Sequence, residues 1–82
     1  METTGIINEY KVRLLAVPAG TKFTAVKREA GLTWDDDYTV IKFGDDVDDA
    51  DDFRHVHPGA AKLLDDAGID IGSLGAVIEV IL

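Results

Sequence analysis

The most apolar run of the chain lies at its C-terminal end, and this run limits the folds that the chain can adopt. Residues 76–82 read AVIEVIL, with Glu79 as the one charged residue. β-branched residues favour strands, and a strand this apolar has to be covered on at least one face and is expected to be covered on both. The sequence therefore predicts a central strand that lies between two other strands.

The N-terminal part supplies strand partners. Within residues 10–17 (YKVRLLAV), apolar and aromatic residues alternate with Lys11 and Arg13, which is the period-two pattern of a half-buried strand. Ile6 and Ile7 predict a short strand before it, and a tight turn at Asn8-Glu9 would join the two.

A short helix is expected after this hairpin. The Pro-Ala-Gly sequence at 18–20 breaks the strand, Thr21 is the predicted N-cap and Gly31 the predicted left-handed C-cap. Between them, one face of the helix is apolar. A helix of about three turns is marginal in water by itself, so we expect it to pack on the sheet. The residues of the apolar face are Phe23, Val26 and Ala30.

A strand at residues 38–43 (YTVIKF) precedes an acidic segment. Residues 44–53 contain six aspartates and few apolar residues, which predicts a solvated loop. Phe53 and Val56 are expected to form either a short strand or an anchor that pins the loop. Pro58 then suits the first position of a helix, and residues 60–67 (AAKLLDDA) are expected to be helical, with Leu63, Leu64 and Ala67 buried.

This order of elements predicts one α+β domain over residues 1–82, because a chain of this length can bury one hydrophobic core. We expect a mixed sheet of four or five strands, one main helix packed across it and a second short helix. The last strand would lie between the N-terminal hairpin and the middle strand.

Two stretches of the chain resemble segments of one known protein family. Residues 17–26 (VPAGTKFTAV), followed by Ala30, are similar to the strand-to-helix join of the ubiquitin-fold modifier. Residues 63–69 (LLDDAGI), with Gly72 and then residues 77–81 (VIEVI), resemble the short helix, Gly-Ile turn and final strand of ubiquitin-like domains. Together they cover about half of the chain. The chain thus resembles the ubiquitin-like β-grasp family, and the resemblance implies the β-grasp fold.

The family implies two kinds of function: covalent tagging or sulfur carriage through a C-terminal glycine tail, and non-covalent docking through the sheet face. This sequence ends at Ile81-Leu82 and has no terminal glycine. We therefore expect a non-catalytic protein-binding module or accessory subunit. The alternative is a modifier or sulfur carrier whose tail lies beyond Leu82.

The charge narrows the class of partner. The chain has 16 acidic and 8 basic residues, a net charge of −8, which argues against binding nucleic acid or anionic lipid. A protein partner fits better, and an acidic mimic of nucleic acid that blocks a basic protein is a further hypothesis. The absence of a long apolar stretch and of a signal sequence favours a cytoplasmic location and no membrane contact, and we expect a monomer or weak oligomer.

No residue pattern predicts catalysis, a metal or a cofactor. The chain has no cysteine, no glycine-rich phosphate loop and no spacing typical of a nucleophilic triad. His55 and His57 would share one face of an extended segment and could ligate a transition metal, but ordinary loop histidines fit better. The acidic segment lacks the glycine and glutamate of a calcium-binding loop. We expect no enzyme.

Charge placement and one tryptophan give the candidate binding residues. Five of the eight basic residues lie in the first long strand and the helix, whereas nine of the sixteen acids lie between Asp35 and Asp52. We predict contacts through the outer sheet face around Lys11, Arg13 and Lys42. Trp34 is expected to cover the core, or else to form part of the binding surface, where tryptophan is enriched.

Overall fold

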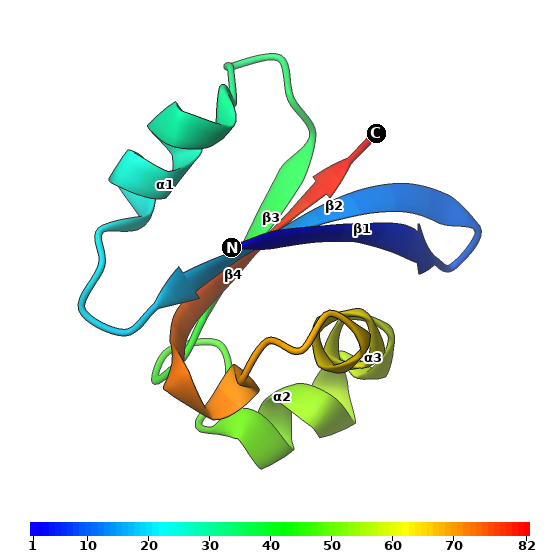
Figure 1. Ribbon diagram of the computed structural model, residues 1–82, viewed down its shortest axis with the longest axis vertical. Coiled ribbons are helices and arrows are strands. Elements are labelled where there is room, and N and C mark those ends of the chain that lie inside the picture. The colour runs from blue at the N-terminus through cyan, green and yellow to red at the C-terminus, as the bar shows by residue number, and fades with distance from the viewer.

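The computed structural model, which describes residues 1–82, has helices on both faces of a four-stranded sheet (Figure 1). Helix α1 covers one face, and α2 and α3 cover the other. The strands are β1 (Glu2–Ile7), β2 (Tyr10–Pro18), β3 (Tyr38–Lys42) and β4 (Leu74–Ile81). The helices are α1 (Phe23–Ala30), α2 (Ala50–Val56) and α3 (Pro58–Asp66), with a 3₁₀ turn at Ile71–Ser73 before β4.

The strands follow the order β1-β2-β4-β3, so the predicted central position of the last strand is confirmed. The predicted mixed sheet is wrong, because all three strand pairs are antiparallel. The physical reason lies in the connections. After β2 the chain returns through α1, so that β3 runs in the same direction as β2, and β4 enters between them in the opposite direction. Every ladder around β4 is thus antiparallel.

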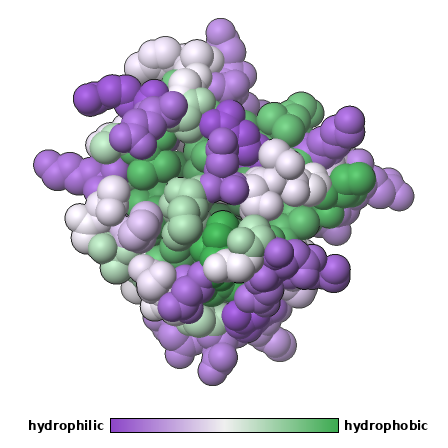
Figure 2. Space-filling model, in the orientation of Figure 1, coloured by the Kyte–Doolittle hydropathy of each residue, from purple (hydrophilic) through white to green (hydrophobic).

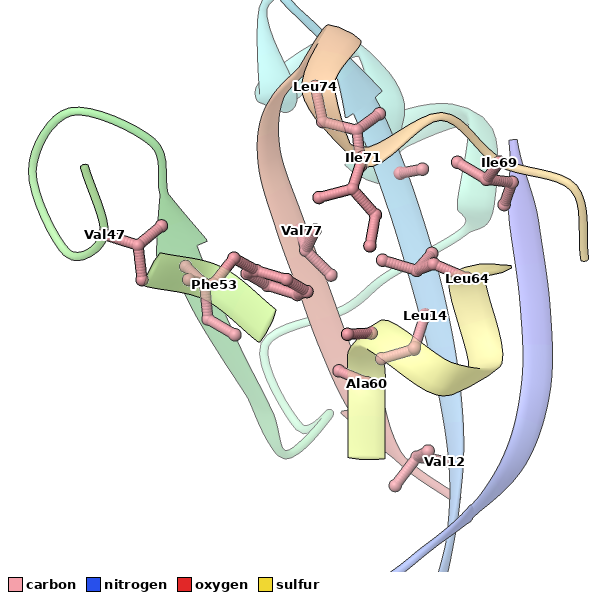
Figure 3. Close-up of a cluster of buried hydrophobic side chains, with 13 residues drawn as sticks. Val12, Leu14, Val47, Phe53, Ala60, Leu64, Ile69, Ile71, Leu74 and Val77 are labelled. Atoms are coloured by element: carbon pink, nitrogen blue, oxygen red, sulfur yellow. The ribbon is translucent and has the colours of Figure 1, made fainter. Parts of the chain in front are cut away.

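The two inner strands are covered on both faces, so their side chains alternate between two apolar clusters. The larger cluster lies under α2 and α3 and has thirteen buried residues (Figure 3). The smaller one lies under α1 and has five buried residues, all from β2 and β4. The larger cluster includes Val12, Leu14, Phe53, Leu64, Ile71 and Val77, and the smaller one consists of Leu15, Val17, Ala76, Ile78 and Val80.

The predicted hairpin is confirmed, and its first strand is longer than Ile6-Ile7. Asn8 and Glu9 both have positive φ, 50° and 73°, which is the backbone of a type I′ two-residue turn. Gly5 lies in β1 beneath α3. A Cβ atom at this position would lie 2.3 Å from Cδ2 of Leu63, so the glycine lets α3 approach the strand closely.

The predicted C-cap of α1 is confirmed and the predicted N-cap is wrong. Gly31 has φ 71°, and its N–H donates to the carbonyl of Arg28 at 3.1 Å. At the other end Lys22 occupies the cap position without a side-chain hydrogen bond. Thr21 belongs instead to the preceding turn, because its N–H donates to the carbonyl of Pro18 at 3.1 Å.

The acidic segment is more ordered than a solvated loop. Asp49 caps α2, with its carboxylate accepting the Asp52 N–H at 2.8 Å, so the helix begins at Ala50, inside the predicted loop 44–53. Phe53 is fully buried, and its ring centroid lies 5.5 Å from that of Phe43. The predicted anchor is therefore confirmed for Phe53, and the alternative short strand is wrong.

Helix α3 begins at Pro58, as predicted. Leu64 is buried and Leu63 half-buried, but Ala67 is exposed because the helix ends one residue before it. The guanidinium of Arg54 in α2 donates to the carboxylate of Asp65 in α3, which lowers the pKa of that carboxyl below its ordinary value.

None of the helices combines the length and the apolar composition that are needed to span a membrane.

We predict that Glu9→Gly stabilises the protein by about 0.5 to 1 kcal/mol, because glycine adopts a positive φ without the steric cost that glutamate carries. The measurement is urea unfolding followed by circular dichroism. Thr4→Gly is the matched control, since Thr4 lies exposed in the extended backbone of β1. There glycine should destabilise, and a loss of stability in both variants would contradict the turn assignment.

We also predict that Phe53→Ala destabilises the protein by about 3 to 5 kcal/mol, because it leaves a cavity where a fully buried ring packs against the sheet. Val56→Ala, in the same helix but half exposed, should cost less than about 1 kcal/mol. Equal effects in the two variants would show that the acidic segment is not pinned by Phe53.

Candidate binding surface

Helix α1 has only eight residues and leaves part of its sheet face uncovered, near the β1–β2 turn. In the register of these strands Ile6 lies opposite Lys11, and Thr4 lies opposite Arg13. The Ile6 side chain is 67% exposed. Figure 2 shows hydrophobic atoms at the surface on this side of the molecule. Ile6 is thus one of the large apolar side chains that the fold leaves exposed.

Lys11 stands in the middle of this uncovered face. Its side chain is exposed and makes no hydrogen bond or ion pair. On one side its neighbour is Ile6, and on the other it is Leu82, whose N–H donates to the Lys11 carbonyl at 3.0 Å. Leu82 is 66% exposed. A free ammonium group therefore lies between two exposed aliphatic side chains.

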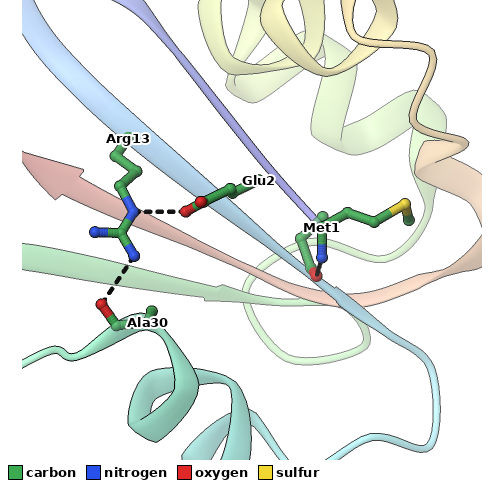
Figure 4. Close-up of polar contacts among 5 residues, drawn as sticks. Met1, Glu2, Arg13 and Ala30 are labelled. Carbon is green, nitrogen blue, oxygen red and sulfur yellow. Dashed lines mark hydrogen bonds and ion pairs between the residues drawn. The ribbon is translucent and has the colours of Figure 1, made fainter.

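Arg13 lies at the border between the uncovered face and α1 (Figure 4). Its Nε donates to Glu2 Oε2 at 2.7 Å, and its Nη2 donates to the carbonyl of Ala30, the last residue of α1, at 2.9 Å. A cation at a helix C-terminus is electrostatically favourable. Arg13 thus joins β1, β2 and α1 and holds the rim of the surface in place, with part of its side chain still accessible.

The structure does not bring Lys42 together with Lys11 and Arg13. Lys42 is on the same face of the sheet but at the far end of the outer strand β3, where it pairs with Ala76. Its ammonium lies 5.1 Å from the centroid of the Phe23 ring, at the start of α1. Helix α1 therefore separates it from the two basic residues of β2.

Trp34 does not cover the core. Its side chain is fully exposed, in the loop between α1 and β3, so the core-lid interpretation is wrong. The loop turns sharply here because Asp36 Oδ2 accepts the Thr33 N–H at 2.5 Å. Contact with a partner, the other interpretation of Trp34, is still a prediction.

The two histidines and the acidic segment do not form a metal site, and several of the acidic side chains accept hydrogen bonds from the backbone. His55 and His57 lie at the end of α2 rather than in an extended segment, and the His57 ring is 5.5 Å from that of Phe53. No group of three or more His, Cys, Asp or Glu residues is placed to hold a metal ion. In the acidic segment, the carboxylates of Asp46, Asp49 and Asp52 accept backbone N–H groups.

A hollow on the α2–α3 face was not apparent from the sequence. It includes Glu79, Thr39, Val56 and His57 in its lining. Glu79, the one charge of the apolar run, is half-buried there and has no hydrogen-bond partner within the chain. The isolated charge was visible in the sequence, but the face toward which it points was not.

Comparison with known proteins identifies no relative: no protein-family model, no curated protein and no solved structure matches the chain. A functional assignment therefore rests on the residues of the chain and on their arrangement.

Proposed function

We propose that the chain is a non-catalytic, cytoplasmic protein-binding module that contacts its partner through the uncovered sheet face beside α1. The observation that carries the proposal is the placement of exposed Ile6 and Leu82 on either side of the unpaired Lys11. Protein interfaces combine apolar with polar and charged side chains, and here Arg13 and Glu2 form the polar border of the surface.

The rigidity of this surface supports the proposal. Lys11 and Ile6 belong to paired strands, and Arg13 ties those strands to α1 through two hydrogen bonds. Side chains on a rigid sheet lose less conformational freedom on binding than side chains on a loop. The non-catalytic part of the proposal is supported by the interior, in which every buried side chain is apolar.

We also keep a ubiquitin-like relationship as a proposal. The succession of hairpin, α1, β3 and final strand β4 supports it, together with the position of β4 inside the sheet. Between β3 and β4 the chain has two helices, α2 and α3, where the resemblance implied one. The antiparallel pairing of β4 with β2 counts against it, because the family resemblance led us to expect a mixed sheet. The binding proposal is independent of this relationship, since it depends only on the exposed surface.

Two pairs of matched variants test the binding proposal. Partners captured from host lysate by the tagged wild-type protein should be reduced about tenfold with Lys11→Glu, because a charge reversal at the interface opposes binding. Lys62→Glu reverses the charge of another exposed lysine, in α3, and should leave capture unchanged. Ile6→Ser and Val56→Ser form the second pair. Both residues are exposed, but only Ile6 belongs to the proposed surface, so Ile6→Ser should reduce capture and Val56→Ser should leave it unchanged.

Capture is measured by quantitative mass spectrometry, and circular dichroism checks that all four variants are folded. A set of partners retained equally by all four variants would place the binding surface elsewhere.

A further inference from the structure

The outer edge of β3 has backbone groups without partners. The carbonyl of Asp37 accepts the Ile81 N–H at 2.9 Å, and the Phe43 N–H donates to the Gly75 carbonyl at 3.0 Å. In an antiparallel ladder the bonded pairs recur at every second residue, so the odd-numbered residues of β3 bond to β4. The N–H and C=O groups of Tyr38 and Val40 therefore point away from the sheet.

The backbone groups at the C-terminal end of this edge have hydrogen-bond partners, whereas those in its middle do not. At the C-terminal end the turn after β3 satisfies Lys42, whose N–H donates to Asp46 Oδ2 at 2.9 Å and whose carbonyl accepts the Asp46 N–H at 2.9 Å. No backbone hydrogen bond outside the β3–β4 ladder involves Tyr38 or Val40. β3 is the outermost strand on its side of the sheet (Figure 3). Four adjacent backbone groups are thus free to pair with another strand.

The charge of the protein is concentrated around this edge. Residues 35–52 contain nine acids and one lysine, a net charge of −8, which equals that of the whole chain. The seven acids and seven basic residues of the remaining chain cancel. The acids lie both before β3, at residues 35–37, and after it, at residues 45–52. Most of these side chains are exposed. The field of the molecule therefore attracts cations toward both ends of β3.

We propose that the outer edge of β3 binds an extended, basic segment of another protein, which pairs with Tyr38 and Val40 as a fifth strand. Strand addition to an open edge obtains its affinity from backbone hydrogen bonds, and side chains determine its specificity. Here the aspartates on both sides of β3 select Lys and Arg in the added segment. This site is at the opposite edge of the sheet from β1 and does not involve Lys11 or Ile6, so it goes beyond the function proposed above.

The other open edge does not fit a basic segment. On β1 the corresponding outward groups are those of Glu2, Thr4 and Ile6. The Met1 carbonyl accepts the Ala16 N–H at 2.7 Å, and the bonds to β2 continue through the odd-numbered residues of β1. The charges beside this edge are mixed, with Lys11 and Arg13 on the neighbouring strand. The charge distribution therefore assigns the basic segment to β3.

The experiment is a titration of the isotope-labelled protein with a synthetic peptide of about eight residues that alternates Lys and Val, followed by NMR. We expect the amide hydrogens of Tyr38 and Val40 to exchange rapidly in the free protein and to become protected when the peptide binds. Raising the salt to about 0.5 M should weaken binding about tenfold, because surface charges are screened.

Two control peptides separate pairing from charge attraction. A peptide with methyl groups on its backbone nitrogens keeps its charge but cannot donate to a strand edge, and it should bind at least about tenfold more weakly. A peptide with Glu in place of Lys should not bind. Equal binding of the methylated and unmethylated peptides would overturn the proposal in favour of an electrostatic association without strand pairing.

Variants of the protein test the edge itself. Val40→Pro removes one outward N–H while the β4 ladder keeps its bonds, and we expect at least about a tenfold loss of affinity. Thr4→Pro makes the same change at the outward-facing position of β1 and should leave peptide binding unchanged. The combined change of Asp35, Asp37 and Asp45 to Asn, three carboxylates that accept no hydrogen bond, should weaken binding and reduce its salt dependence.

Loss of binding in Thr4→Pro but not in Val40→Pro would overturn the proposal by placing the peptide on β1. If Val40→Pro does not fold, protection of the Tyr38 and Val40 amides in the wild-type protein decides the question, and unchanged exchange at both amides during binding would overturn the proposal. Lys11→Glu should retain peptide binding, so failure of the β3 site and failure of the sheet-face function can be distinguished.

Discussion

The insertion of β4 between β2 and β3 is the interaction on which the rest of the structure depends. Its odd and even residues supply different clusters, with Val77 under α2 and α3, and Ile78 and Val80 under α1. Burying each such side chain contributes about 1.5 to 3 kcal/mol, whereas a whole domain of this size is stable by only about 5 to 15 kcal/mol. Because β4 also bonds to both neighbours, it joins β3 to the N-terminal hairpin and contributes to the surface under both helical layers.

The acidic segment shows how this small domain tolerates concentrated charge. Like charges so close together repel one another, which opposes a compact state. Phe53 and Val47 offset this cost by entering the larger apolar cluster, and several of the carboxylates accept backbone N–H groups at the turn and at the start of α2. The charge is thus held at fixed positions beside β3 and can attract a partner to that edge.

The two proposed surfaces lie where the fold leaves side chains or backbone groups uncovered. Helix α1 is too short to cover the whole face, which leaves Ile6 and Lys11 exposed beside the β1–β2 turn. The sheet has only four strands and does not close, so β3 keeps unpaired backbone groups on its outer side. One surface combines aliphatic side chains with a basic group, and the other combines open backbone with acids. The two surfaces suit partners of different chemistry.

Local features of this protein were determined by the sequence itself. The alternation in β2, the turn at Asn8-Glu9, the left-handed Gly31 and the helix start at Pro58 each depend on neighbouring residues, so a pattern of a few residues predicts them. The apolar run around Glu79 likewise required a central strand. Of the candidate site, the sequence predicted that Lys11 and Arg13 share a face, because residues two apart in a strand do so.

Only the tertiary structure decided how these elements meet. The direction of β4, the exposure of Trp34 and the separation of Lys42 from Lys11 depend on contacts between residues far apart in the chain. A period-two pattern shows which side chains share a face, but it carries no information about the neighbouring strand or its direction. The same holds for the open backbone of β3, because only the register with β4 determines which N–H and C=O groups stay unpaired.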